Sequence, residues 1–208
     1  MKQLLATIGL WTALMSAAAA KTLTIGVDLS GSNPLLIHPN FAHIAASHVG
    51  DQISKLRDGD VINIRSFGAR GEAVNLLNQR IVLSRRVTAR AVAEALRRYL
   101  KSLPEDASVA QGDTNLLAWL EFTSGFDCNN EGSLIVLTDG LESSKLVDAR
   151  ALLAGDVGLP EPQVDLAGCS VTFYGLGAGL PPTPIRHLRE EWQSWITKSG
   201  AAFTAIIP

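Results

Sequence analysis

Residues 22–32 read Thr-Leu-Thr-Ile-Gly-Val-Asp-Leu-Ser-Gly-Ser. The apolar run that ends at Val27 predicts a buried strand, and the carboxylate of Asp28 follows it directly, with the hydroxyls of Ser30 and Ser32 close behind. Oxygen atoms of this kind suit hard cations such as Mg²⁺ and Mn²⁺, which prefer near-octahedral geometry and keep positions for water or a partner's group. One Asp and two Ser are too few for such a site, so more oxygen ligands must come from elsewhere in the chain.

Two later stretches carry suitable oxygen atoms. Residues 112–116, Gly-Asp-Thr-Asn-Leu, open a helical pattern, and residues 134–140, Leu-Ile-Val-Leu-Thr-Asp-Gly, form a second apolar strand that runs into a carboxylate. With the first stretch, they resemble the von Willebrand factor A family and its metal-ion-dependent adhesion site, whose pattern is Asp-x-Ser-x-Ser, a distant Thr and a distant strand-terminal Asp-Gly. Three pieces in this order are a far stronger signal than any one of them.

The resemblance implies both a ligand set and a function. The ion, Mg²⁺ or Mn²⁺, would be bound by three hydroxyls and by two carboxylates acting directly or through ordered water: Ser30, Ser32 and Thr114, then Asp28 and Asp139. An Asp or Glu of a partner protein would complete the shell of the ion, so the chain is expected to be a protein-binding module. Asp113 and Glu142 lie beside these motifs and would add negative charge around the ion.

Simpler interpretations of each piece exist. Asp and Ser bond to their own backbone in loops and helix caps, and Asp139-Gly140 is a common turn pair. The first stretch also resembles the phosphate loop of the actin and sugar-kinase ATPases, but that loop feeds a β-hairpin and needs a second lobe. Here a helical pattern follows the loop, and 208 residues leave little room for two lobes.

Catalysis has little support in the sequence. A haloacid-dehalogenase phosphatase places a general acid two residues after its aspartate nucleophile, whereas Ser30 occupies that position here. Neither motif has a Cys or His nearby to form a nucleophile–base pair. We therefore expect a protein that is not an enzyme. A metal-dependent phosphoesterase and a structural envelope scaffold with a non-functional metal site are the two alternative functions.

The first 20 residues have the layout of a secretory signal peptide. Lys2 precedes an uncharged stretch, residues 3–20, which ends in small residues with an Ala-x-Ala site at Ala18 and Ala20. Cleavage there would leave a domain of residues 21–208 that resembles von Willebrand factor A domains (vWA-like), with Lys21 as its first residue. This domain is expected to be periplasmic or secreted. The alternative is an uncleaved inner-membrane anchor, because 18 uncharged residues are at the short limit for crossing a bilayer.

Charge and cysteine content add two expectations. The net charge of −2 becomes −3 when Lys2 is removed with the leader, and such mild acidity gives no indication of nucleic-acid binding. Cys128 and Cys169 each precede an apolar strand, residues 133–138 and 171–176. If those strands are parallel neighbours in an exported protein, a disulfide is expected at the edge opposite the metal motifs; the alternative is two free buried thiols.

Strand and helix patterns alternate along residues 21–208. This alternation predicts a doubly wound α/β fold, a mostly parallel six-stranded sheet with helices on both faces and one antiparallel edge strand. Ligands of such sheets bind at the carboxyl ends of the strands where the strand order reverses. The strands are expected at residues 22–27, 61–67, 72–83, 133–138, 171–176 and 202–207, and the helices at residues 41–56, 92–103, 114–122, 144–154 and 185–198.

Several conspicuous side chains have simpler roles. The basic residues of the helix at 92–103 oppose its apolar stripe and are expected to be a solvated face. Trp192 and Trp195 share a helical face with Leu188, which favours core packing. His43 and His48 are separated by about 140° on a helix, so they cannot share an ion.

Overall fold

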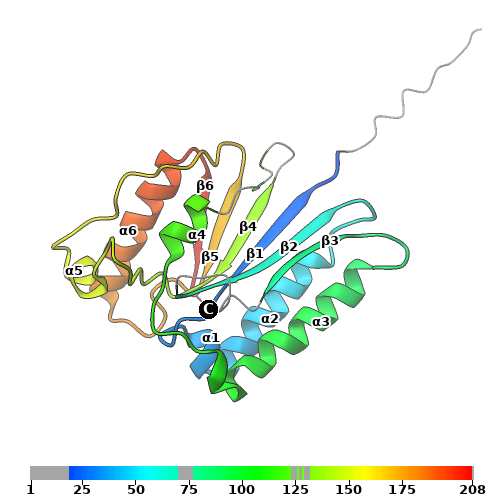
Figure 1. The fold of residues 1–208 in the computed structure, drawn as a ribbon, viewed down its shortest axis with the longest axis horizontal. Coiled ribbons are helices and arrows are strands. Elements are labelled where there is room, and N and C mark those ends of the chain that lie inside the picture. Colours follow the sequence, from blue (N-terminus) through cyan, green and yellow to red (C-terminus); the bar gives the residue numbers. More distant parts are fainter. Residues whose placement is uncertain (1–18, 70–76, 123–125, 127, 129–131, 208) are drawn as a thin grey trace, which may run out of the picture.

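The computed structural model describes residues 19–69, 77–122, 126, 128 and 132–207. A six-stranded sheet forms its centre, with strands in the order β3-β2-β1-β4-β5-β6 (Figure 1). β3 is antiparallel to β2, and every other neighbouring pair is parallel. The strands are β1 Thr22–Asp28, β2 Val61–Phe67, β3 Asn78–Val82, β4 Ser133–Leu137, β5 Ser170–Tyr174 and β6 Ala202–Ile206. The predicted fold class and the single antiparallel edge strand are confirmed.

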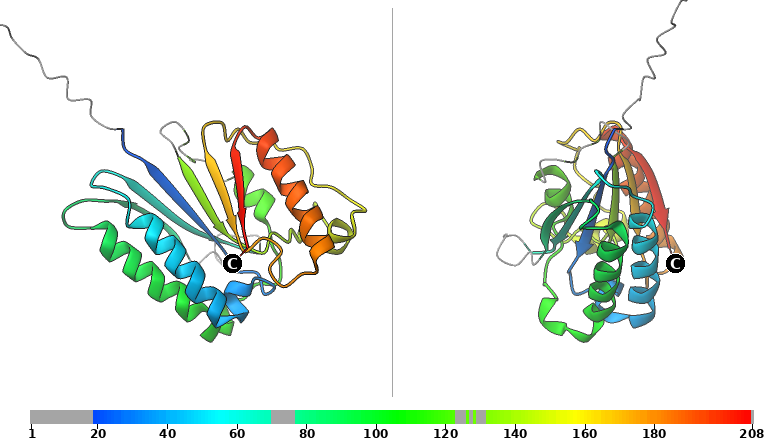
Figure 2. Two further views of the ribbon diagram at one scale, coloured as in Figure 1. Left: turned by 180° about the vertical axis from the view of Figure 1, so that it is seen from behind. Right: turned by 90° about the vertical axis from the view of Figure 1, so that its right-hand side faces the viewer.

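Helices cover the sheet on two sides (Figures 1 and 2). One core joins the sheet to α2 and α3, and a second core on the opposite face joins it to α4, α5 and α6. The helices are α1 Pro34–Ile37, α2 Pro39–Ile53, α3 Ala89–Ser102, α4 Leu116–Phe122, α5 Ala149–Ala154 and α6 Pro182–Lys198, with short 3-10 turns η2 Leu103–Glu105 and η3 Ala107–Val109.

β1 lies at the centre of the sheet and is buried along its whole length. Ile25 and Val27 face the α2 and α3 side, while Gly26 faces the other core. A Cβ atom at Gly26 would lie 2.6 Å from Cη2 of Trp119, so only glycine lets this ring approach the strand. Packing on both faces therefore fixes the strand that presents Asp28 at its end.

Most element boundaries agree with the predicted ones to within a few residues. Of the edge strand predicted at residues 72–83, the structure has β3 at Asn78–Val82, and residues 72–76 lie outside the described part. The differences lie at the ends: α4 begins at Leu116 rather than at residue 114, α6 begins at Pro182 rather than at residue 185, and α5 is confined to Ala149–Ala154, where Asp148 caps it. The short helix α1 was not predicted. Its four residues begin after Asn33, whose side chain accepts a hydrogen bond from the N–H of Leu35, and they are too few to show a helical period.

The cysteine prediction is confirmed. Cys128 and Cys169 form a disulfide with their Cα atoms 4.6 Å apart. Cys169 directly precedes β5, and Cys128 lies ahead of β4, which pairs with β5 in parallel. The disulfide thus joins the amino ends of two strands, at the opposite edge of the sheet from Asp28.

The predicted core packing of the tryptophans is confirmed, and the basic face of α3 is exposed as predicted, except for the partly buried Arg97. Trp192 and Trp195 are buried in the second core. Arg97 on α3 forms an ion pair of 2.8 Å with Asp51, and Arg90 pairs with Glu94 at 3.0 Å. Among the described residues, no helix combines the length and the apolar character needed to cross a membrane. The predicted leader falls on residues 1–20, of which residues 1–18 lie outside the described part.

Candidate metal centre

The two strands that end in carboxylates are neighbours. β1 pairs with β4 in parallel, with Val27 opposite Leu137, so Asp28 and the Thr138-Asp139 pair emerge at the same edge. From β1 the chain proceeds outward to β2 and β3 on one side of the sheet, and from β4 it proceeds outward to β5 and β6 on the other side. The strand order therefore reverses at the junction between β1 and β4. This is the position at which doubly wound sheets bind ligands.

The carboxylate of Asp28 is completely buried at this junction. Its Oδ1 accepts a hydrogen bond of 2.8 Å from the N–H of Ser30, and its Oδ2 accepts one of 2.7 Å from the hydroxyl of Thr138. Burial, and then the nearby charge of Asp139, raise the pKa of Asp28 from 3.8 to about 7, against the opposing effect of the hydrogen bonds. In the metal-free protein this carboxylate is therefore poised to hold a proton near neutral pH.

Asp139 completes a pair of interacting acids. It is 2% exposed, and burial raises its pKa as well. Its Oδ1 accepts a hydrogen bond of 2.9 Å from the N–H of Leu141, and its carboxylate also bonds with the side chain of Ser32. The hydroxyls of Ser30 and Ser32 lie 3.4 Å apart. Since Ser32 is exposed, the group opens to solvent on that side.

Thr114 reaches this edge through its backbone. It forms an antiparallel bridge with Ser143, four residues after Asp139, and Gln111 forms a parallel bridge with Ser30. These bridges bring the segment around Thr114 against both strand-end loops, and Thr114 is 2% exposed. Among the hydrogen bonds of the described residues, none joins the hydroxyl of Thr114 to the other four predicted ligands. Asp28, Ser30, Ser32 and Asp139 are thus brought together directly, and Thr114 is placed beside them.

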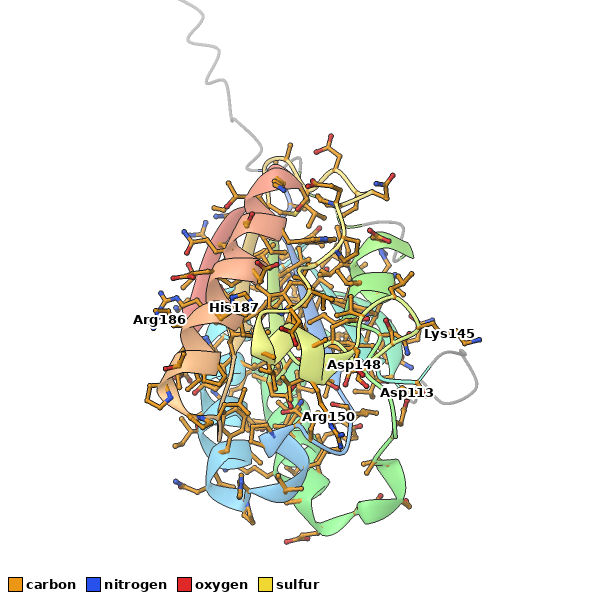
Figure 3. All side chains as sticks on the ribbon, turned by 90° about the vertical axis from the view of Figure 1, so that its left-hand side faces the viewer. Asp113, Lys145, Asp148, Arg150, Arg186 and His187 are labelled. Atoms are coloured by element: carbon orange, nitrogen blue, oxygen red, sulfur yellow. A yellow bond between two sulfur atoms is a disulfide. The ribbon has the colours of Figure 1, made fainter. Side chains whose placement is uncertain are left out.

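The two predicted peripheral acids occupy different settings. Glu142 is fully buried, and its Oε2 accepts a hydrogen bond of 3.0 Å from the N–H of Leu117, at the start of α4. It thereby fastens the loop after Asp139 to the helix that follows Thr114. Asp113 is exposed, and it lies toward the same side of the molecule as Lys145 (Figure 3).

Two residues at the junction were missed by sequence analysis. Thr138 links both strand-end loops, since its hydroxyl donates to Asp28 and accepts a hydrogen bond of 2.9 Å from the N–H of Gly140. Asn33 is fully buried, and its side-chain amide donates to the carbonyl oxygens of Asp28, at 2.8 Å, and Leu137, at 3.1 Å. In the sequence, Thr138 could have been singled out by its position directly before Asp139. No sequence feature pointed to Asn33.

The loop after Asp139 is also held by α6. The indole N–H of Trp192 donates a hydrogen bond of 2.8 Å to the carbonyl oxygen of Gly140, and Trp192 is fully buried. Gly140 has a φ of +75°, in the left-handed region, and a Cβ there would meet Leu176 at 2.2 Å. A Cβ at this position would strain the left-handed backbone of the turn that carries Asp139 and would push the Leu176 side chain aside.

The chemistry of these side chains fits a hard divalent cation. The buried carboxylates of Asp28 and Asp139 repel each other when both are charged. Within the described residues, neither forms an ion pair with a Lys, Arg or His. Hydroxyl and carboxylate oxygens are the ligands that Mg²⁺ and Mn²⁺ prefer. No cluster of three or more His, Cys, Asp or Glu side chains suited to a metal occurs in the described part, so any ion here depends on the hydroxyls.

The fold has counterparts among solved structures. The chain is similar to a structure described as von Willebrand factor type A from Catenulispora acidiphila, with 18% identity and a TM-score of 0.50, over 91% of this chain and 39% of that one. The chain has a von Willebrand factor A-type fold. At this identity the similarity concerns the fold alone, and the vWA-like chain spans about two fifths of the length of that protein.

A second similar structure is the pilus adhesin SpaC from Lactobacillus rhamnosus GG in an open conformation. The identity is 14% and the TM-score 0.46, over 89% of the vWA-like chain and 28% of the adhesin chain. No protein-family model and no curated protein matches the sequence.

Proposed function

We propose that this protein is an exported, divalent-metal-dependent protein-binding module that recognises a carboxylate of its partner. The observation that carries the proposal is the junction of β1 and β4, where Asp28 and Asp139 meet with Ser30 and Ser32 at the reversal of strand order. Mg²⁺ or Mn²⁺ would be bound there by the hydroxyls of Ser30, Ser32 and Thr114. Asp28 and Asp139 would act on the ion directly or through water.

Electrostatics supports a cation at this place. Burial raises the pKa of both acids, and the nearby charge of Asp139 raises that of Asp28 further. A divalent cation would reverse that effect, because it favours the charged carboxylates. An ion held largely by neutral hydroxyls keeps much of its charge uncompensated. It would therefore attract another anionic oxygen on the exposed side near Ser32, such as an Asp or Glu of a partner protein.

Export is the second part of the proposal. The Ala18-x-Ala20 site after an uncharged stretch predicts cleavage before Lys21. The disulfide between Cys128 and Cys169 supports an oxidising compartment, because such bonds persist outside the reducing cytosol. We propose the periplasm or the extracellular medium as the location of the processed protein.

The test has two stages, metal first and partner second. Thermal unfolding of the purified protein is compared in EDTA, Mg²⁺, Mn²⁺ and Ca²⁺, for the native chain, for Asp28→Ala and for the exposed control Asp156→Ala. A ligand present at a hundredfold excess over its Kd stabilises the folded state by about 2.7 kcal/mol. We expect the native chain and the control to gain stability with metal and Asp28→Ala to gain none. The absence of any metal response in the well-folded native chain would favour the scaffold alternative.

For the partner stage, binding is measured on a peptide array in which every Asp- or Glu-containing peptide has an Asn or Gln counterpart. Carboxylate recognition predicts binding in Mg²⁺ that disappears in EDTA and in the amide counterparts. Equal binding to acid and amide peptides would contradict it. Metal-dependent hydrolysis of a generic phosphoester by the native chain, absent in Asp28→Ala, would instead support the phosphoesterase alternative.

A further inference from the structure

A second buried carboxylate lies at the opposite end of β1. Asp60 directly precedes β2 and is 8% exposed. Its Oδ1 accepts a hydrogen bond of 2.9 Å from the backbone N–H of Lys21, and its Oδ2 accepts one of 2.7 Å from the backbone N–H of Arg57. The backbone of Asp60 is held too, since its N–H donates to the carbonyl of Arg57 and its carbonyl accepts from the N–H of Leu83. One carboxylate oxygen of Asp60 is thus fixed against the backbone nitrogen of Lys21.

That nitrogen belongs to the residue at which the processed chain is expected to begin. Signal-peptide cleavage hydrolyses the Ala20–Lys21 bond: water adds, Ala20 leaves with a new carboxylate, and the nitrogen of Lys21 becomes an ammonium group. We propose that Asp60 is the binding site for this α-ammonium group, an inference that rests on the export part of the proposed function. Capture of a chain terminus by fixed polar groups is a known mode of recognition, and a charged donor makes the hydrogen bond to a carboxylate shorter and stronger.

The surroundings allow this change without loss of packing. Ala19 and Ala20 are exposed, and neither belongs to the two cores. The carbonyl of Lys21 accepts a hydrogen bond of 2.9 Å from the N–H of Val61, and the β1–β2 ladder starts at the next residue, with Thr22 opposite Val61. The new terminus would therefore be held from both sides at the point where the central strand begins.

Other charged groups face the same place. A cleft of about 620 Å³ lies at the amino ends of β1, β4 and β5, next to the end of α2. The charged or titratable side chains along this cleft are those of Lys21 itself, His48, Lys55 and Arg57, which disfavour a second cation, and Asp58 and Asp60, which favour it. β4 and β5 contribute only uncharged side chains, those of Ser133, Ile135, Ser170 and Thr172. Asp60 outweighs the others because it alone among these acids is within hydrogen-bond distance of the nitrogen of Lys21.

The pH dependence of this contact has a definite sign. An α-amino group has an ordinary pKa of roughly 7.7–8.0. The Asp60 carboxylate favours the charged amine, so the pKa of the group is higher in the folded state than in the unfolded one. The stabilisation is therefore complete below about pH 7.7 and is lost as the pH rises through the folded-state value.

The experiment compares two chains with defined first residues. One begins at Lys21, and the other keeps Ala19 and Ala20, so that the nitrogen of Lys21 stays an uncharged amide. Both contain every described strand and helix, because these lie between Thr22 and Ile206. Each is made with Asp60, with Asp60→Asn and with the exposed control Asp58→Asn, and the midpoint of thermal unfolding is measured at pH 6.5 and at pH 10.

With Asp60 present at pH 6.5, the chain that begins at Lys21 is expected to unfold about 2–4 °C higher than the longer chain. Asp60→Asn and pH 10 should each reduce the difference, and Asp58→Asn should preserve it. Equal midpoints at pH 6.5, or a difference unchanged at pH 10, would overturn the proposal even if Asp60→Asn failed to fold. The mass of the protein isolated from cells reports separately whether the leader is removed, so a failure of export is distinguished from a failure of this contact.

Discussion

The hydroxyl of Thr138 donates a hydrogen bond of 2.7 Å to Oδ2 of Asp28, across the boundary between the two strands that end at the candidate metal centre. Thr138 also accepts from the N–H of Gly140, so one side chain fixes the carboxylate of one loop and the backbone of the other. Groups that orient a metal ligand in this way commonly change metal affinity by about 10–100-fold when they are removed.

Replacing Thr138 with Val should therefore weaken metal binding about tenfold or more, because the isosteric side chain cannot donate to Asp28. Titration of Mn²⁺ measures this directly. Thr138→Ser keeps the hydroxyl and should restore most of the affinity. Equal Mn²⁺ affinities for Thr138→Val and the native chain would show that the hydroxyl does not position Asp28 for metal.

Asp28→Asn should make the metal-free protein more stable at pH 8. The substitution removes a buried negative charge that burial and Asp139 both disfavour, while a side-chain oxygen remains to accept from the N–H of Ser30. In EDTA the variant should unfold at a higher temperature than the native chain, and in excess Mg²⁺ the order should reverse. Asp156→Asn, at an exposed position, provides the control and should change neither midpoint.

The difference between the native chain and Asp28→Asn should depend on pH in EDTA. The pKa of Asp28 is about 7 in the folded protein, against 3.8 for an unperturbed side chain. Between these values the folded state keeps a proton that the unfolded chain has released, so each rise in pH lowers the stability of the native chain. Thermal midpoints should diverge from about pH 4, in favour of the variant, and stop diverging above about pH 7. A difference that is constant across this range would contradict the raised pKa.

Asn33→Leu should destabilise the fold itself. The amide of Asn33 satisfies the buried carbonyls of Asp28 and Leu137, and a carbonyl left without a partner costs about 1–3 kcal/mol. Denaturant unfolding in EDTA measures the loss without any contribution from metal. Asn40→Leu is the control, because Asn40 is exposed at the start of α2 and should tolerate the change.

Removal of the disulfide should separate stability from metal binding. Replacing Cys128 and Cys169 with Ser should lower the free energy of unfolding by about 2–4 kcal/mol. The metal-dependent gain in thermal midpoint should remain, because the bond lies at the opposite edge of the sheet from Asp28. Loss of that gain in a folded variant would indicate coupling between the two edges.

The sequence was sufficient to predict the sheet and the edge at which the candidate metal centre lies, at the carboxyl ends of β1 and β4. Asp28 and Asp139 each follow an apolar run, and parallel strands bring their carboxyl ends together, so the pair could be placed before the structure was known. The roles of Thr138 and Asn33 could not be predicted in this way. Their hydrogen bonds depend on the register between β1 and β4, and periodicity within one strand carries no information about the register between two.

The hydrogen bond from Trp192 to the carbonyl of Gly140 gives the molecule a fluorescent reporter. The indole is buried, yet its one polar atom touches the residue next to Asp139. A ligand that shifts this turn changes the environment of the ring and hence its emission. Ligand titrations of the unlabelled protein would therefore report ligand binding at the carboxyl ends of β1 and β4. The same titrations of Trp192→Phe would show the emission of Trp119 and Trp195 without that of Trp192.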